Sequence, residues 1–378
     1  MYFNETHNAF RESVKRFIDK EINPHMDEWE ETTVPLHDLF KKMGDLGLLG
    51  VRYDQKYGGQ GLDYWFETVL LEELGHIQGF GVSIAIAVQT NLATPALDMF
   101  GSEYIKDKYL RAAIAGEMVS AIAVTEPGAG SDVAALKTKA VRKGDFYIIN
   151  GSKTFITNGN QADFLTLLAR TSDQPGHHVF SLLIVPTNLP GFSVGKKLDK
   201  MGLRSSDTAL LFFDDVKVPV ENLVGKEGEG FIYQMKQFQH ERFSVLPIAY
   251  VASKDMIDMT VDYLKQRVAF GEPLINKQVL RHRLVQWLAE IESLKQLTYH
   301  IVRMKTQGLD VTREISMGKL LSGQLITKVA DGCLQMFGGT GFMNETLISR
   351  YYRDARLLPI GGGADEVMSD VIAKREGY

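Results

Sequence analysis

The spacing of apolar residues changes twice along this chain, and each change limits what the chain can fold into. Up to about residue 118 the apolar residues follow the spacing of one helix face, as in Phe10, Val14, Phe17 and Ile18. From about 119 to 226 they alternate, as strands do, and from 227 onward helical spacing returns in long segments. We therefore predict an α+β protein with an N-terminal helical domain (1–118), a middle β domain (119–226) and a C-terminal helical bundle (227–378). A chain of 378 residues is long enough for such a division.

The middle segment contains several short runs with the composition of strands. These runs are Lys137–Val141, Phe146–Ile149, Phe164–Ala169, Val179–Val185, Leu210–Phe213 and Val216–Val218. Gly144 and the pair Asn150-Gly151 are predicted hairpin turns. Because no helical pattern separates the runs, an antiparallel sheet or small barrel is favoured over a doubly wound sheet.

Composition excludes several classes of partner and compartment. A net charge of −5 and a pI near 6.0 argue against nucleic acid as a partner. The single cysteine, Cys333, rules out an internal disulfide framework and fits a reducing compartment. The N-terminus lacks the apolar stretch of a secretory or transit peptide, so we expect a cytoplasmic protein, or a mitochondrial matrix protein if a transit peptide has been removed. Apolar runs such as Val82–Val88 are too short for a membrane span.

The familiar catalytic and ligand-binding motifs are missing. The nine histidines show no metal-ligand spacing, so no metal is expected. The segment Gly151–Thr154 lacks the upstream glycine of a phosphate-binding loop, and there is no G-x-S-x-G elbow. No G-x-G-x-x-G opens a βαβ unit, so an oxidoreductase with this sequence would need a tightly held flavin rather than a nicotinamide cofactor.

Two glycine-rich segments carry the strongest signal. Ala123–Asp132 is a short apolar strand followed by a glycine-rich turn, whose free N–H groups could face a phosphate or a flavin edge, although such a segment alone is most often a simple turn. The second segment is Gln335–Asp354. Together they resemble the two signature patterns of the acyl-CoA dehydrogenase family, and the resemblance extends over nearly the whole chain. It implies bound FAD, a middle antiparallel β domain and a C-terminal four-helix bundle.

The resemblance also implies which residues contact FAD within one subunit. These residues are Ile122, Val124, Thr125, Gly130, Ser131, Phe155, Ile156, Thr157, Ala364 and Glu366. Thr125 would lie near the pyrimidine edge, and Thr157 would donate a hydrogen bond where charge grows on the flavin. Phe155 replaces the tryptophan usual in the family, which keeps an aromatic surface but loses an N–H donor. The alternative for Phe155 is a core position in the β domain.

A second set of residues is similar to those that reach the FAD of a neighbouring subunit in relatives. This set is Arg267, Phe270, Gln278, Gln335, Met336, Gly338 and Gly339. A guanidinium suits the pyrophosphate because it can donate two parallel hydrogen bonds. The resemblance therefore implies an obligate oligomer, a homotetramer built as a dimer of dimers. Without it, Arg267 would be interpreted as a solvated cation at a helix end.

The most informative difference from the usual family pattern concerns the position of the catalytic base. Many members carry a glutamate in the loop after Y-R-D, but Gly362 occupies that position here. Long-chain and isovaleryl-type members resemble this chain in placing the base on an earlier helix, which points to Glu241 as the group that removes the α-proton. Gly362 would leave room for Glu241 and keep its N–H for the thioester carbonyl. The alternatives are that Glu241 only pairs with Arg242, or that Glu366 is the base.

The implied reaction is oxidation of an acyl-CoA to a trans-2-enoyl-CoA, with electrons passed to an electron-transfer flavoprotein. The resemblance assigns acyl-CoA contacts to Thr90, Thr94, Ser131, Gln239, Arg242, Gly362 and Gly363. Small residues at Thr90 and Thr94, and an ending similar to citronellyl-CoA-type enzymes, favour a medium, long or branched acyl group. Two other functions stay open: a flavin-dependent oxidase or monooxygenase, and a non-catalytic acyl-CoA-binding relative. Burial against flavin and an acyl chain should raise the pKa of Glu241.

Overall fold

The N-terminal third of the chain is helical, as predicted. A computed structural model describes residues 2–378. Its first part contains α1 (Glu5–Glu21), η1 (Asn23–His25), α2 (Met26–Thr32), α3 (Leu36–Asp45), η2 (Gln55–Tyr57), α4 (Tyr64–Leu74), α5 (Phe80–Ala87), η3 (Val88–Ala93), α6 (Pro95–Phe100), α7 (Glu103–Ile105), η4 (Lys106–Leu110) and α8 (Arg111–Ile114). The apolar faces of α1, α3, α4 and α5 share one large core with the C-terminal helices.

The segment Phe80–Phe100 forms one continuous helical run of 21 residues, in which η3 is a π-helical turn. The expectation that its apolar stretch is too short to span a membrane is therefore wrong, because length and composition alone would allow a span. However, 83% of its most apolar window is buried inside the protein. This burial is typical of a core helix, and π-helical turns often mark functional sites.

The middle part is a sheet with strands β1 (Ser120–Ala123), β2 (Lys139–Lys143), β3 (Phe146–Thr157), β4 (Phe164–Arg170), β5 (Phe180–Pro186), β6 (Phe192–Val194), β7 (Thr208–Pro219) and β8 (Leu223–Val224). Short helical turns η5 (Val133–Ala135) and η6 (Val220–Asn222) connect them. The strand order is β6-β7-β3-β2-β4-β5-β8, with β1 paired to β4. The sheet is mainly antiparallel, but β4 pairs in parallel with both β1 and β2, which corrects the prediction of a purely antiparallel sheet.

One predicted turn in this sheet is not a turn, and two predicted strands are a single strand. Asn150-Gly151 lies inside β3, at a register shift against β7, so only Gly144 (φ 60°) makes the expected hairpin. The runs Leu210–Phe213 and Val216–Val218 belong to one strand, β7, which continues through Asp215. Asp215 has φ 50° and accepts a hydrogen bond from Asn150 Nδ2 at 2.9 Å, so the two irregularities stabilise each other across the sheet.

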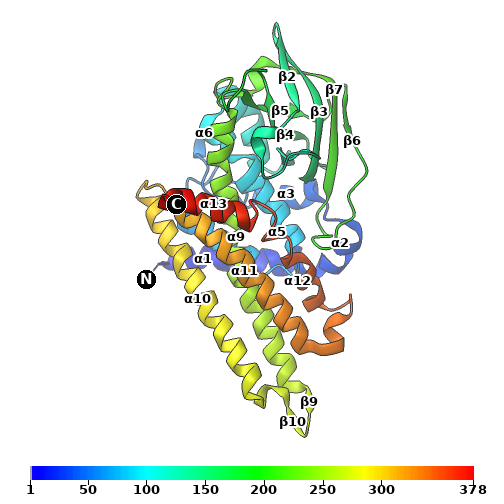
Figure 1. The fold of residues 1–378 in the computed structure, drawn as a ribbon, viewed down its shortest axis with the longest axis vertical. Coiled ribbons are helices and arrows are strands. Elements are labelled where there is room, and N and C mark those ends of the chain that lie inside the picture. The colour runs from blue at the N-terminus through cyan, green and yellow to red at the C-terminus, as the bar shows by residue number, and fades with distance from the viewer. Residues whose placement is uncertain (1) are drawn as a thin grey trace.

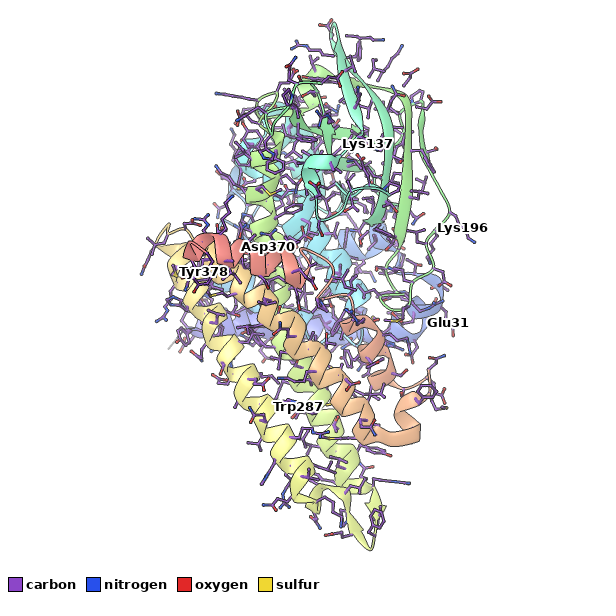
Figure 2. The ribbon with its side chains drawn as sticks, in the orientation of Figure 1. Glu31, Lys137, Lys196, Trp287, Asp370 and Tyr378 are labelled. Carbon is purple, nitrogen blue, oxygen red and sulfur yellow. The ribbon has the colours of Figure 1, made fainter. Side chains whose placement is uncertain are left out.

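The C-terminal part contains α9 (Gly230–Gln266), β9 (Val268–Ala269), β10 (Glu272–Pro273), η7 (Leu274–Asn276), α10 (Gln278–Thr306), α11 (Thr312–Phe337), η8 (Gly338–Phe342), α12 (Leu347–Ala355) and α13 (Asp365–Glu376). Helices α9, α10 and α11 run side by side, and α13 packs on α11 (Figure 1). Trp287 of α10 lies among these helices (Figure 2). A Cβ on Gly332 would come within 2.2 Å of the Trp287 ring, so glycine permits this close approach.

Helix α9 connects all three parts of the molecule. Its N-terminal half contacts β5, η3 and α6, and its C-terminal half packs on α10 and α11 (Figure 1). Gln237 fixes this arrangement by accepting a hydrogen bond from the Ala96 N–H at 2.7 Å. Residues 237–242 therefore lie where the helical and β parts meet.

Candidate active site

The turn after β1 is held rigidly by its own backbone and by β3. Glu126 and Ala129 exchange backbone hydrogen bonds of 2.9 and 3.1 Å, and the Thr154 N–H donates to the Thr125 carbonyl at 2.9 Å. Gly130 and Ser131, which follow this small ring, are exposed. The predicted cofactor loop is therefore a fixed surface turn with accessible backbone at its tip.

A buried ion pair beneath this turn was not predicted from the sequence. Lys153 of β3 is fully buried and donates to the Val124 carbonyl (2.7 Å) and to Glu126 Oε1 (3.0 Å). Glu126 also accepts from the N–H groups of Lys137 (2.7 Å) and Thr138 (2.9 Å). Burial opposes ionisation of Glu126, but the charge of Lys153 and these donors outweigh it, so its pKa is lowered. Burial lowers the pKa of Lys153 to about 8.

Phe155 presents its ring to the surface beside this turn. A register shift between Lys153 and Ile156 bulges β3, Phe155 adopts φ 58°, and 68% of the residue is exposed. Positive φ is unusual for a bulky residue and is found at sites that constrain it. The alternative of a core position is therefore wrong. An exposed aromatic face next to a glycine-rich turn fits the isoalloxazine ring of FAD.

The other predicted contacts on β1 and β3 differ in exposure. Val124 and Ile156 are 7% and 2% exposed and pack into the cores on the two sides of the sheet, so only their backbone is available to a cofactor. Ile122 and Thr157 are partly exposed and lie at the same end of the sheet as Phe155. The structure thus brings Thr125, Ser131, Phe155 and Thr157 to one region.

The second predicted cofactor set lies elsewhere in the chain. Arg267 and Gln278 are exposed near the β9–β10 hairpin, and Phe270 is 92% exposed with φ 55°. Gln335, Gly338 and Gly339 are exposed at the adjoining end of α11, which Tyr263 joins to α9 through a 3.2 Å hydrogen bond to the Phe337 carbonyl. Met336 is buried, so its side chain belongs to the core. This end of the molecule is opposite the β sheet (Figure 1), and one chain does not bring the two sets together.

Glu241 of α9 lies next to Gly362, which belongs to the loop that precedes α13. A Cβ on Gly362 would lie 3.2 Å from Glu241 Oε1 and 3.6 Å from its Cγ, so the carboxyl group occupies the space that a side chain at 362 would fill. Burial raises the pKa of Glu241 to about 7, although Arg242 and Lys319 act in the opposite direction. Within residues 2–378 the Gly362 N–H donates no hydrogen bond to a protein acceptor.

Lys319 of α11 holds this loop in place and was also missed by sequence reasoning. It is fully buried, and its Nζ donates to the carbonyls of Leu358 and Gly363 (2.8 Å to the latter). Burial lowers its pKa to about 8. The only available signal was a lysine at a position that helical periodicity places on the buried face of α11, and neither its carbonyl partners nor their distance can be predicted from spacing.

Polar groups without partners surround Glu241. Arg242 is 8% exposed, its Nε has no hydrogen-bond partner in the described chain, and it forms no salt bridge with Glu241. Gln239 Oε1 is likewise buried without a partner. Buried polar atoms are nearly always satisfied, so these two atoms are free to bond a polar ligand. The alternative in which Glu241 serves only as an ion-pair partner of Arg242 is not supported. Glu366 is exposed on α13, and Ala364 caps that helix.

Thr90 and Thr94 are both buried on η3 and its C-terminal end. The Thr94 hydroxyl bonds the Gln89 carbonyl (2.6 Å) and Tyr53 Oη (2.7 Å). Thr90 lines a cavity of about 20 Å³ together with Arg52, Glu67 and Asn91. This space holds about one or two water molecules, so the predicted roomy pocket is narrow at this point.

The whole chain matches the family that its motifs resemble. Residues 4–117, 121–216 and 228–377 match the family models described as the acyl-CoA dehydrogenase N-terminal, middle and C-terminal domains. The chain is 36% identical to the mitochondrial long-chain specific acyl-CoA dehydrogenase of Mus musculus, over 99% of this chain and 87% of that protein. It is 34% identical to the mitochondrial isovaleryl-CoA dehydrogenase of Pongo abelii, over 98% and 88%.

Solved structures show the same fold. An acyl-CoA dehydrogenase from Geobacillus kaustophilus superposes with a TM-score of 0.96 at 39% identity, covering 100% of this chain and 99% of that one. Members of the family are flavoprotein oxidoreductases of fatty acid metabolism that use FAD, act on acyl-CoA and typically pass electrons to an electron-transfer flavoprotein. The exposed Phe155 ring and the fixed turn beside it fit that cofactor. From its three matched domains, its identity with relatives over almost its full length and its fold, this chain belongs to the acyl-CoA dehydrogenase family.

Proposed function

We propose that this acyl-CoA dehydrogenase uses Glu241 of α9 as its catalytic base. The observation that carries the proposal is the position of Glu241 Oε1, which fills the space that a side chain at residue 362 would occupy. A carboxyl group that reaches this loop from a helix can serve where a loop glutamate serves in other members. Its pKa of about 7 suits a base that works near neutral pH.

The residues around Glu241 would bind and activate the thioester. The Gly362 N–H, free of protein acceptors in the described part of the chain, can donate to the thioester carbonyl and stabilise the charge that grows on its oxygen. Glu241 then takes the proton from the adjacent α-carbon. Bound FAD supplies the acceptor for the hydride of the β-carbon. Arg242 Nε and Gln239 Oε1 are available for the polar part of acyl-CoA. The resemblance adds Gly363 and Ser131 as further contacts.

The finer assignments belong to the same proposal. The product would be a trans-2-enoyl-CoA, formed from a medium, long or branched acyl group. Arg267, Phe270, Gln278 and the exposed end of α11 would complete the FAD site of a neighbouring chain, because they are exposed and remote from their own Phe155. We further propose that the chain forms a homotetramer that passes electrons to an electron-transfer flavoprotein, in the cytoplasm or the mitochondrial matrix.

The decisive experiment compares Glu241→Gln with the parent protein. We expect Glu241→Gln to bind FAD and acyl-CoA but to reduce its flavin about 100- to 10,000-fold more slowly on anaerobic mixing with acyl-CoA, because the general base is lost. Asp370→Asn is the control, since this exposed carboxyl group on α13 belongs to neither predicted site and should leave the rate unchanged. Flavin reduction by Glu241→Gln at the parental rate would exclude Glu241 as the base.

The same experiment separates the alternative functions. Flavin that is reduced by acyl-CoA and reoxidised slowly by air indicates a dehydrogenase. Rapid reoxidation with formation of peroxide would indicate an oxidase. Absence of flavin reduction with every acyl-CoA tested, in a protein loaded with FAD, would indicate a binding protein and would overturn the proposal.

A further inference from the structure

A cluster of charged side chains surrounds His240 of α9, next to the proposed base. The cluster consists of Arg52, Glu67, His240 and Lys305, from the loop before α4, from α4, from α9 and from α10. Arg52 Nε lies 2.5 Å from Glu67 Oε2, and Arg52 Nη2 lies 3.1 Å from His240 Nδ1. Asn91 donates to the other oxygen of Glu67. His240 directly precedes Glu241, so the cluster adjoins the catalytic group.

Glu67, the acidic residue of this cluster, already has partners, whereas the ammonium group of Lys305 has none in the described chain. Glu67 is 5% exposed, forms an ion pair with Arg52 through Oε2 and accepts a hydrogen bond from Asn91 at Oε1. Lys305 Nζ has no carboxylate within 4.0 Å anywhere in residues 2–378 and makes no hydrogen bond there. Its nearest aromatic neighbours are the rings of Tyr64 (4.3 Å to the centroid) and Phe243 (5.1 Å). Tyr64 also faces Arg52 at 4.4 Å, so its ring lies near two cations.

His240 offers a neutral N–H donor near the unpaired ammonium group of Lys305. An arginine can only donate, so His240 Nδ1 must accept from Arg52 and the ring proton must be on Nε2. Burial and the charges of Lys305 and Arg52 lower the pKa of His240 well below its usual value, which keeps the ring neutral. Burial lowers the pKa of Lys305 to about 8, so it is mainly protonated at neutral pH. The cluster therefore presents unused donors and one uncompensated positive charge.

The cluster is enclosed but remains accessible. Lys305 and His240 are partly exposed, and the Arg52 side chain keeps 15% of its surface. Arg52 and Glu67 also line the cavity of about 20 Å³ beside Thr90. A purely alkyl chain that ended against Lys305 would exclude water from the ammonium group without replacing the hydrogen bonds that water makes to it. Burying a charged group in this way costs free energy. A carboxylate in the same place would pair with the free ammonium group.

We propose that the cluster formed by Arg52, Glu67, His240 and Lys305 binds a carboxylate at the far end of the acyl group, so that the substrate is an acyl-CoA with a second, distal acid group. This inference rests on the proposed function, because it places the thioester end at Glu241 and Gly362. Lys305 Nζ and His240 Nε2 donate to the distal carboxylate, and Arg52 holds His240 in the tautomer that can do so. Lys305 is thus a specificity-determining residue, not a catalytic one.

The test compares acyl-CoAs of equal length with and without the distal acid. We measure kcat/KM for glutaryl-, adipyl- and suberyl-CoA against pentanoyl-, hexanoyl- and octanoyl-CoA. We expect at least one carboxylated substrate to be preferred about tenfold or more over its alkyl partner. Lys305→Met should reduce that ratio about tenfold or more, and Lys305→Arg should restore part of it. Lys254→Met, which removes an exposed lysine of α9 paired with Asp258, should leave the ratio unchanged.

Two results would overturn the inference: preference for the alkyl substrate at every length, or a ratio that Lys305→Met does not alter. If Lys305→Met does not fold, the ratio in the parent protein and in His240→Phe decides. Calorimetric binding of adipyl-CoA and hexanoyl-CoA to Glu241→Gln gives a readout without turnover, and equal Kd values would also refute it. If alkyl substrates reduce the flavin and carboxylated ones do not, only this inference fails. If no acyl-CoA reduces it, the proposed function fails as well.

Discussion

Lys153 under the β1 turn and Lys319 under the loop before α13 hold glycine-rich segments in the same way, but they differ in how they treat the nearby glutamate. Both lysines are fully buried, both donate to backbone carbonyls, and burial lowers the pKa of each to about 8. Lys153 lies 3.0 Å from Glu126. Lys319 has no carboxylate within 4.0 Å in the described chain, although the charge of Glu241 still acts on it.

The two glutamates, Glu126 and Glu241, therefore differ in their ability to take up a proton. Glu126 is ionised and satisfied by Lys153 and two backbone N–H groups, so it cannot take up a proton near neutral pH. Glu241 has no bonded cation, and its pKa is raised to about 7. If Glu241 is the base, as we propose, a lysine near a glutamate has two uses here: Lys153 is bonded to Glu126, whereas Lys319, like Arg242, acts on Glu241 without a direct ion pair in the described chain.

Breaking the bonded couple should have the largest effect. Lys153→Met leaves Glu126 as an uncompensated buried charge and removes a donor from the Val124 carbonyl. We expect a loss of about 3–5 kcal/mol in the free energy of unfolding, measured by urea denaturation. Lys139→Met, which removes an exposed lysine on β2 paired with Asp173, should change it by less than about 1 kcal/mol. The double variant Lys153→Met/Glu126→Gln should recover part of the loss, and failure to do so would argue against the ion pair as the cause.

The raised pKa of Glu241 should be visible in the pH dependence of both stability and the rate of flavin reduction. The pKa of Glu241 is about 7 in the folded protein and 4.5 is its ordinary value, so the folded state binds more protons between these values. Stability should therefore fall as pH rises through this window, by on the order of 3 kcal/mol, and level off above about pH 7. The rate of flavin reduction should rise over the same range as the base ionises. Urea midpoints and rapid-mixing rates measure the two trends, and Glu241→Gln should remove this contribution whereas Asp370→Asn should not.

The sequence was most informative where side-chain pattern follows the fold directly. The α, β, α order follows from apolar spacing, because each part buries one face of its helices or strands. Motifs pointed to Thr125 and Phe155, which the fold brings to one region, and to Glu241 and Gly362, which lie next to each other. The departure at Gly362 was useful because a missing side chain requires another group to fill its space.

Features that depend on partners distant in sequence could not be predicted. Lys319 is bonded to a loop about forty residues later, and its spacing on α11 does not reveal that loop. The parallel pairing of β4 with β1 and β2 depends on crossovers that alternation does not encode. The continuity of β7 through Asp215 depends on Asn150 of the neighbouring strand. The cluster around Lys305 combines four segments, and each of its charged residues alone resembles an ordinary surface residue.

Lys319→Met tests how Lys319 affects both the loop before α13 and the pKa of Glu241. The variant leaves the carbonyls of Leu358 and Gly363 without a donor, at a cost of about 1–3 kcal/mol in unfolding free energy. It also removes a positive charge that favours ionised Glu241, so the apparent pKa in the rate profile should rise. Lys328→Met on the same helix, whose lysine is exposed and paired with Glu290, is the control for both readouts. A stability loss without a change in the rate profile would make Lys319 a brace like Lys153.

The smallest effect is expected for a substitution at Gly362, which fills the space that Glu241 occupies. Gly362 has φ +67°, and a Cβ there would lie 3.2 Å from Glu241 Oε1, so Gly362→Ala should cost about 1–2 kcal/mol in stability and push the carboxyl group away from the substrate. We expect flavin reduction to slow about tenfold while acyl-CoA still binds. Gly361→Ala is the matched control, because a Cβ at Gly361 would make only ordinary contacts with Leu357 at 3.4 Å or more and φ there is not positive. If Gly362→Ala loses stability but keeps its rate, Glu241 does not act from this position and the base must be sought elsewhere.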